Sequence, residues 1–320
     1  MSLTELSSNP LNAVVQSIRE DNETTHVERF LWLQTLLGDA VTAADIRPLA
    51  LLLKEHFVPK GGLLFTANSP PEHLHFIVSG EVRYGEKGFT RFVANDVIGF
   101  VDSLIDRPHP YDAIVQQDAV ILRLKVTDWL GHLEDHFPTL QRIILNNLRD
   151  LPTIAEPSDP SSELVKALLE FEEESTPSGL FVRRLLAVRA CETFRTASVQ
   201  ALSQVVRRSH SIFLSPGETL PEAQKQPGIF VVVCGSCEVV FPEATENTST
   251  LCPPGSLLCS LHSLVELPDD CEIRAQSTVE ILHILPEKFF DIMEDHFDLG
   301  RSALSYFARR REAANQAKTQ

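Results

Sequence analysis

The chain carries the stretch Leu-Glu-Asp-His-Phe at residues 133–137 and Met-Glu-Asp-His-Phe at residues 293–297. The same offset of 160 residues lays the whole of residues 95–137 over residues 255–297 without a gap. This alignment also superimposes an apolar alternation, a proline and one face of a helix, so chance is a poor explanation for it. A period this long indicates a duplicated domain rather than a solenoid, whose repeats span about 20–50 residues. The sequence therefore predicts two copies of one domain.

The length and composition of the chain agree with a globular protein of two domains. It has 320 residues, of which 43% are hydrophobic and 22% are charged. No apolar run approaches the ~20 residues of a membrane span, and residues 1–25 lack the basic start and apolar core of a secretory signal. We therefore expect a cytoplasmic protein that binds no membrane and keeps its six cysteines as thiols. The formal net charge of −16 disfavours nucleic acid as a partner, because it repels a phosphate backbone.

The period of the apolar residues changes several times along each copy. Helical spacing over residues 27–56 is followed by short segments at 57–65, 74–82, 90–93, 97–100 and 113–124 that lie between glycines and prolines. Many short strands separated by glycine and proline turns predict an antiparallel roll or barrel. We therefore expect a mainly β fold with flanking helices, made of two antiparallel β-rolls of the jelly-roll type. The expected parts are a disordered arm (1–25), a first domain (26–150), an acidic Pro-rich linker (151–178), a second domain (179–311) and a tail (312–320).

The expected linker contains an acidic segment at residues 163–174 with apolar residues at helical spacing. Asp159 and Pro160 are residues that commonly start a helix. The segment is either a helix that couples the two domains or a solvated connection, and its composition favours the solvated connection.

The order of the short motifs resembles one known family. A helical entry is followed by Phe57 with Gly61 four residues later, a strand through Ser79-Gly80, a turn from Asp96 to Gly99, and Pro108 shortly before the last strand. This order resembles the cyclic nucleotide-binding domain family, which includes the bacterial catabolite activator type and the regulatory subunits of cyclic-AMP-dependent kinase. The resemblance covers roughly residues 26–149 and 180–311.

In that family the ligand lies between a Phe-Gly-Glu-x-Ala-Leu segment and a following Pro-Arg-x-Ala segment. The resemblance implies that the glutamate accepts a hydrogen bond from the ribose hydroxyl and that the arginine pairs with the cyclic phosphate. In the first copy the glycine is kept as Gly99, the glutamate is Phe100 and the arginine is His109. The pocket candidates of this copy are Gly99, Phe100, Val101, His109 and Tyr111.

The second copy departs further from the family. Its candidates are Cys259 in place of the glycine, Ser260 in place of the glutamate, Leu261, and Asp269 in place of the arginine. A carboxylate about 4 Å from a phosphate charge costs on the order of 4 kcal/mol at an effective dielectric constant of 20. We therefore expect no conventional cyclic nucleotide in the second copy and disfavour one in the first. A slip of the alignment would offer Arg107 or Arg274 instead, although Arg274 alternates with apolar neighbours and is expected to face solvent.

Other residues suggest further chemistry. Cys234 and Cys237 have the spacing of a zinc or iron–sulfur ligand pair, but the repeat places Cys237 at an apolar position, which favours structural thiols. His73 and His75 share one face of a strand and could form the edge of a metal site. We assign no metal ligands and no catalytic residues, because the sequence has no phosphate-binding loop, nucleophile elbow or zincin motif.

The resemblance and the altered pocket together predict a non-catalytic regulatory or scaffold protein. Its ligand would be a small molecule or a protein partner, and a homodimer could form through the C-terminal helices. Two alternatives stay open. One is a subunit that responds to cyclic AMP or cyclic GMP through the first domain, and the other is a thiol or metal sensor that uses the cysteines of the second domain.

Overall fold

The computed structural model of the chain describes residues 29, 33, 43–85, 90–149, 155–170, 176–221, 226–240, 249–259, 261–265 and 271–319. The predicted arm at 1–25 lies outside these residues, and so do the candidates Ser260 and Asp269. Contacts divide the chain into two compact units, Met1–Ile143 with Ala308–Gln320, and Ile144–Phe307. In the described residues, no helix is long and apolar enough to cross a membrane.

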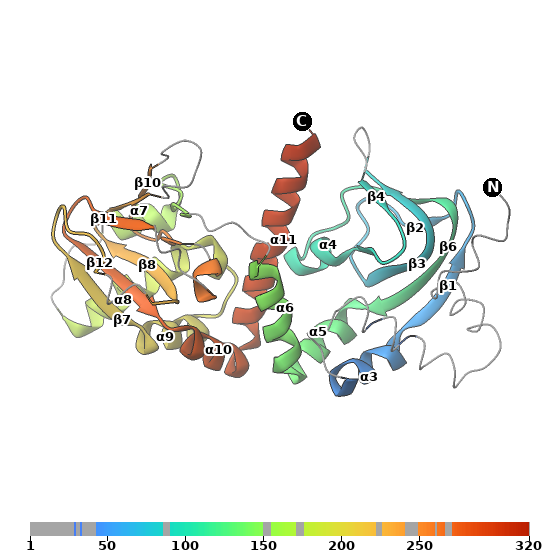
Figure 1. Cartoon of the computed structure of the whole chain (residues 1–320), viewed down its shortest axis with the longest axis horizontal. Helices are drawn as coiled ribbons and strands as arrows, with labels where there is room; N and C mark the ends of the chain where they lie inside the picture. Colours follow the sequence, from blue (N-terminus) through green and yellow to red (C-terminus); the bar gives the residue numbers. More distant parts are fainter. Residues whose placement is uncertain are drawn as a thin grey trace. The chain divides into compact units, whose positions relative to one another are not determined.

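The first unit is built on an antiparallel sheet of six strands in the described part of the chain. The strand β6 pairs with β1, β2 and β3, and β3 also pairs with β4 and β5. Figure 1 shows that β3 and β6 curve strongly, so that the sheet closes into a roll. The strands are β1 (Lys54–Val58), β2 (Leu63–Phe65), β3 (His73–Tyr84), β4 (Thr90–Phe92), β5 (Val97–Ile98) and β6 (Ala113–Lys125). This mainly antiparallel fold with flanking helices confirms the predicted fold class.

A glycine allows the two long strands to bend together. Gly80 has φ +95°, and a Cβ atom there would lie 2.5 Å from the carbonyl oxygen of Asp118 and 2.6 Å from the Cα atom of Ala119. The pairing of β3 with β6 shifts register on both sides of this position. Bulges of this kind bend a strand and increase its twist. The side chains that face inward then meet in an apolar core that includes Ile77, Val82, Ile98, Val115 and Ile121.

Helices flank this roll in sequence. They are α3 (Ala43–Leu52), α4 (Phe100–Ile105), α5 (Val126–Asp135) and α6 (Phe137–Arg149), which continues into the second unit. The predicted strand at 97–100 is wrong at its end, because Phe100 begins α4. Gly99 has φ +90° and turns the chain there, and its carbonyl accepts the first helical hydrogen bond from the N–H of Ser103.

The second unit contains two antiparallel sheets of three strands each in the described residues, with the orders β7-β12-β8 and β10-β9-β11. Gly235 separates β8 from β9, and a Cβ atom there would lie 2.1 Å from the carbonyl oxygen of Thr278. Gly80 and Gly235 therefore allow the same kind of close approach in the two units. The strands are β7 (His210–Leu214), β8 (Ile229–Cys234), β9 (Cys237–Val240), β10 (Ser249–Cys252), β11 (Glu272–Ala275) and β12 (Val279–Ile284).

The helices of the second unit include part of the predicted linker. α7 begins at Glu163, after Ser162 as its N-cap, and not at Asp159, whose carboxylate accepts hydrogen bonds from Ser161. Glu156, near the start of the expected linker, exchanges backbone hydrogen bonds with Leu257. For residues 163–174, the choice between a coupling helix and a solvated connection stays a prediction. The final helix continues past residue 311 to Thr319. The helices are α7 (Glu163–Leu169), α8 (Pro177–Ala190), α9 (Val199–Arg208), α10 (Pro286–Asp295) and α11 (Phe297–Thr319), with short 3-10 turns at Glu192–Phe194 and Leu261–Leu264.

Candidate functional site

A buried carboxylate is the centre of the predicted pocket in the first unit. Asp102 lies on α4 with 4% of its side chain exposed. Its Oδ2 atom accepts hydrogen bonds from the Tyr84 hydroxyl at 2.8 Å and from Nδ1 of His109 at 2.9 Å. Its Oδ1 atom accepts one from Nε of Arg107 at 2.9 Å. We call these four residues the Asp102 cluster.

The hydrogen bonds of the cluster keep Asp102 ionised. Burial by itself raises the pKa of a carboxyl group, but the hydrogen bonds from His109, Tyr84 and Arg107 outweigh burial here and lower the pKa of Asp102. An ionised carboxylate only accepts hydrogen bonds, so the Nδ1 atom of His109 carries the proton. Both basic side chains of residues 98–111 therefore point at a negative charge of the chain itself.

Aromatic rings fix His109 in this position. The His109 ring is 1% exposed and stacks on the Phe65 ring, with the two centroids 3.7 Å apart and the planes at 16°. The Tyr84 ring makes T-shaped contacts with the rings of Phe65 and Tyr111. The backbone of His109 is also held, because its N–H donates to Ser69 and its carbonyl accepts from the N–H of Asn68. His109 is thus a packed and hydrogen-bonded part of the roll.

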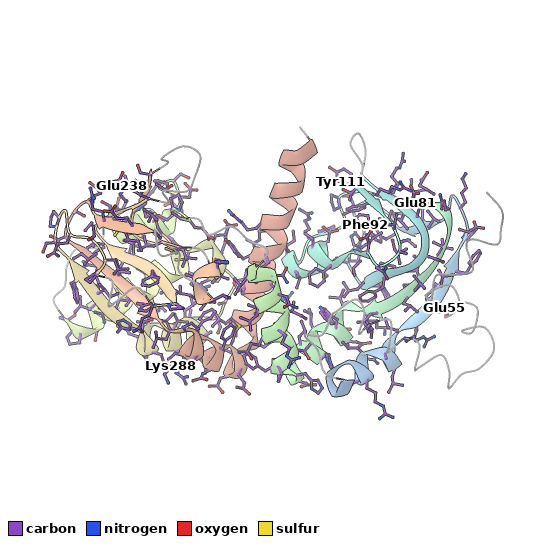
Figure 2. All side chains as sticks on the ribbon, viewed as in Figure 1. Glu55, Glu81, Phe92, Tyr111, Glu238 and Lys288 are labelled. Carbon is purple, nitrogen blue, oxygen red and sulfur yellow. The ribbon has the colours of Figure 1, made fainter. Side chains whose placement is uncertain are left out.

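The other candidates of the first unit lie at different places. Phe100 is half-buried and packs edge to face against Trp129 of α5, with the ring centroids 6.5 Å apart. Val101 follows it on α4 and is half-buried. Tyr111 is 42% exposed and lies at the same end of the roll as Phe92, as Figure 2 shows. The structure therefore brings Gly99, His109 and Tyr111 into one region and turns Phe100 toward Trp129.

The sequence reasoning missed the residues that hold His109. Asp102 occupies the position of the alanine in the family's Phe-Gly-Glu-x-Ala-Leu segment, so a charged residue at a position for a small apolar one was the available signal. Tyr84 and Phe65 carried no comparable signal, because only the fold brings β2 and β3 next to residue 109. Arg107, which was weighed as a phosphate ligand, is ion-paired with Asp102.

In the second unit, the described candidates are buried. Cys259 and Leu261 are both 0% exposed, and the sulfur of Cys259 lies 3.7 Å from that of Cys271. Arg274 faces solvent, as expected, with half of its side chain exposed and a hydrogen bond to Glu272.

The buried cysteines of the second unit are poor candidates for thiolate chemistry. Cys237 and Cys252 lie directly opposite each other on β9 and β10. Burial raises the pKa of each to about 12 and raises the pKa of Cys191 even further. The thiolate is the form that reacts or binds metal, so these values count against a thiol sensor. Within the described ranges, no three His, Cys, Asp or Glu side chains are grouped so that they could hold a metal ion. His73 and His75 therefore belong to no such group.

A comparison with models of protein families finds one family that matches the region of this site. Residues 55–136 match the cyclic nucleotide-binding domain model. The match covers β1 to α5 and includes the Asp102 cluster. A search of curated proteins returned no matching sequence.

This chain also matches several solved structures. The regulatory domain of Toxoplasma gondii PKA with cAMP is 11% identical, with a TM-score of 0.34 over 91% of this chain and 99% of that one. A cAMP-independent PKA regulatory subunit from Trypanosoma cruzi, bound to guanosine, is 14% identical, with a TM-score of 0.32 over 86% and 87%. At TM-scores below 0.5, these similarities support no inference about ligand or partner.

Proposed function

We propose that the chain is a non-catalytic regulatory or scaffold protein whose first unit does not bind a cyclic nucleotide through the phosphate contact of the family. The observation that carries this proposal is the Asp102 cluster. In the family an arginine of this segment meets the cyclic phosphate, whereas here the corresponding His109 is bonded to a buried carboxylate. The pocket candidates Gly99, Phe100, Val101 and Tyr111 supply no replacement cation.

The energies of the cluster support the proposal. A phosphate charge about 4 Å from Asp102 is repelled by on the order of 4 kcal/mol at an effective dielectric constant of 20, which corresponds to about three decades in affinity. Turning His109 and Arg107 away from Asp102 toward a ligand would leave the buried charge with only the Tyr84 hydroxyl as a partner, at about 3–5 kcal/mol. Either route makes binding of the nucleotide weak.

A conversion experiment tests this proposal. The double variant Asp102→Ala with His109→Arg removes the carboxylate and restores the family's arginine. We expect isothermal titration calorimetry to detect cyclic AMP or cyclic GMP binding to this double variant and none to His109→Arg alone, because the new guanidinium would pair with Asp102. Asp135→Ala, an exposed carboxylate on α5, is the matched control. Equal binding by the double variant and by His109→Arg would show that Asp102 does not block the site.

The alternative is a subunit that responds to cyclic AMP or cyclic GMP through the first unit. The family-model match over residues 55–136 favours it, because the match contains the whole segment 98–111. In this alternative the Asp102 cluster opens when the ligand binds, and His109→Arg alone strengthens binding. The same titrations therefore distinguish the two functions.

We also propose that the second unit is a second copy of the same fold. Its support is that each unit pairs its last strand with its first strand and with a middle strand. In addition, Gly80 within β3 and Gly235 between β8 and β9 both have a positive φ and both pass close to the backbone of a neighbouring segment. Asp269, in place of the family's arginine, argues from the sequence against a cyclic nucleotide in this copy. We propose a protein partner, or a second chain bound through the C-terminal helices, rather than nucleic acid or a membrane.

A further inference from the structure

We propose that the roll of the first unit binds a small oxyanion of the size of inorganic phosphate, in a cavity lined by His56, His75 and Arg123. No residue of the Asp102 cluster lines this cavity, although Phe65 contacts both His75 and His109. The proposal does not depend on the proposed function.

The strand register gathers basic side chains at one end of the inner face of the roll. On β6, Arg123 lies directly opposite His75 of β3 and Lys54 of β1. One step along, Ile121 lies opposite His56 and Ile77. Residues that pair directly point to the same side of a sheet, as do residues two apart on one strand. Because Ile77 and Ile121 belong to the apolar core, His75 and Arg123 also face the interior.

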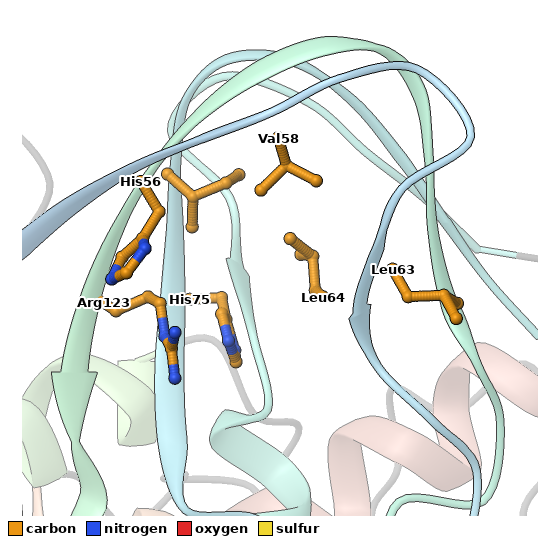
Figure 3. Close-up of a pocket in the computed structure, with 7 residues that line it drawn as sticks. His56, Val58, Leu63, Leu64, His75 and Arg123 are labelled. Carbon is orange, nitrogen blue, oxygen red and sulfur yellow. The ribbon is translucent and has the colours of Figure 1, made fainter.

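These side chains border a small cavity. Its volume is about 60 Å³, which is room for roughly four to six water molecules. Figure 3 shows the rings of His56 and His75 and the guanidinium of Arg123 gathered on one side, and Val58 and Leu64 across from them. The full lining is His56, Val58, Leu63, Leu64, His75, Ile121 and Arg123. A tetrahedral oxyanion is of this size, whereas a nucleotide needs a pocket of about 300 Å³ or more.

Polar atoms of the lining lack partners. His75 is 3% exposed, and neither of its ring nitrogens has a hydrogen-bond partner among the described residues. The same holds for Nε of Arg123, although its NH2 group lies 3.1 Å from Nδ1 of His73. Buried polar groups are normally satisfied by protein, water or a ligand, so unpartnered ones at a cavity mark a place where a hydrogen-bonding group can bind. The missing partner must accept hydrogen bonds, since Nε of Arg123 can only donate.

The charge of the cavity selects an anion. In the described part of the chain, Arg123 forms no ion pair with a carboxylate, unlike Arg91, which pairs with Glu81, and Arg107, which pairs with Asp102. No acidic side chain lines the cavity. A metal cation would be repelled by the fixed charge of Arg123, even though His56 and His75 both line the cavity. Burial, together with the charge of Arg123, lowers the pKa of His75 to about 3, so the neutral ring offers one N–H to an anion.

The test is binding of inorganic phosphate to the full chain, with sodium chloride at equal ionic strength as the reference. We expect phosphate to raise the unfolding temperature and to move the ring resonances of His75 in NMR spectra. Arg123→Gln should weaken phosphate binding at least tenfold. Arg91→Gln, an exposed arginine of the same roll, should leave it unchanged.

A second variant keeps the test independent of damage to the fold. His75→Phe keeps a ring of similar shape and removes both unpartnered nitrogens, so the variant should be at least as stable as the parent without phosphate and should no longer respond to it. Sulfate should bind like phosphate, because both are tetrahedral oxyanions. Equal stabilisation of the parent, Arg123→Gln and His75→Phe, or no effect of phosphate on the parent and its His75 resonances, would overturn the proposal. Asp102→Ala should bind phosphate normally, which separates this result from the test of the proposed function.

Discussion

Asp102 places a negative charge at a position that the motif of the cyclic nucleotide-binding domain family fills with alanine. The carboxylate is satisfied by three donors from β3, from the residue after α4 and its cap, and from the loop before β6. A buried charge with three hydrogen bonds is a stable arrangement, whereas the same charge with a missing partner is costly. At the scale of single residues, this cluster therefore holds the loop 106–112, and it is the basis of the proposal that a phosphate is repelled here.

The first prediction concerns the stability that Asp102 provides. Asp102→Asn removes the charge but keeps the shape, and the amide cannot accept from all three donors. We expect the free energy of unfolding to fall by about 1.5–3 kcal/mol, the range for hydrogen bonds to charged groups. Urea unfolding measures this change. Asp135→Asn, which is exposed, should change stability by no more than about 0.5 kcal/mol, and an equally small effect at Asp102 would contradict the structural role.

The second prediction concerns pH. Burial lowers the pKa of His75 to about 3 and that of His283 to about 4, with a smaller contribution from Arg123 and from His210 respectively. In the unfolded chain both residues take up protons near pH 6.5, while in the folded chain they stay neutral. The stability that each provides is therefore complete above about pH 6.5 and is lost as the pH falls toward 4, by about 1.4 kcal/mol per pH unit.

Urea unfolding at several pH values between 7.5 and 4.5 checks this prediction. His75→Phe and His283→Phe should each make the stability of the unit that contains the substitution less dependent on pH. An unchanged slope in both variants would show that the two rings are protonated in the folded state.

The sequence located the loop of the site but not its centre. Gly99 and His109 lie at positions that the short motifs of the family define, so comparison of the sequence with these motifs could locate them. Asp102 is in the same motif, yet two of its three partners are Tyr84, 18 residues earlier, and Arg107, which follows the αL cap at Asp106. Side-chain contacts between separate elements are not encoded in spacing, and for that reason the cluster became visible only in the fold.

At the scale of elements, the roll depends on the close passage of β3 and β6. Gly80 lies where a Cβ atom would overlap the backbone of residues 118 and 119. No flexible side chain can move aside there, so the strands themselves would have to separate. Gly80 thus allows the bend within β3, the strand that also carries His75 on the inner face of the roll.

The third prediction compares two glycines of the first unit. Gly80→Ala should lower the free energy of unfolding by about 2 kcal/mol or more, since it combines a positive φ with a backbone overlap. Gly131→Ala, in the middle of α5 where a Cβ atom meets nothing within 4 Å, should raise it by about 0.5–1 kcal/mol. Thermal unfolding of the two variants tests this contrast. The account of the roll is wrong if both substitutions have the same sign.

The elements themselves were largely predictable, because burial on one side imposes a period on the sequence. The long strands at 73–84 and 113–125 lie where the apolar residues run or alternate between turn residues. The end of the strand at Ile98 was misplaced, because Phe100 is apolar in either a strand or a helix and the turn at Gly99 decides between them. The order of residues 156–158 was also missed, since it comes from hydrogen bonds to residues about 100 positions away.

At the scale of the whole molecule, the chain combines a match to the cyclic nucleotide-binding domain over residues 55–136 with an acidic composition, at a net charge of −16. The basic side chains of the pocket segment, Arg107 and His109, are hydrogen-bonded to Asp102. Arg123, in contrast, has no acidic partner in the described residues. The region that matches the family's model thus carries charges that differ from the family's motif, which is the basis of the proposed regulatory function without cyclic nucleotide binding.

The fourth prediction is the direct test of that claim, a calorimetric titration of the unmodified chain with cyclic AMP and with cyclic GMP at pH 7.5. The account predicts no binding tighter than about 100 µM for either nucleotide, and no further loss in the variant His109→Ala. Micromolar or tighter binding that His109→Ala abolishes would contradict it and would establish the first unit as a cyclic nucleotide sensor.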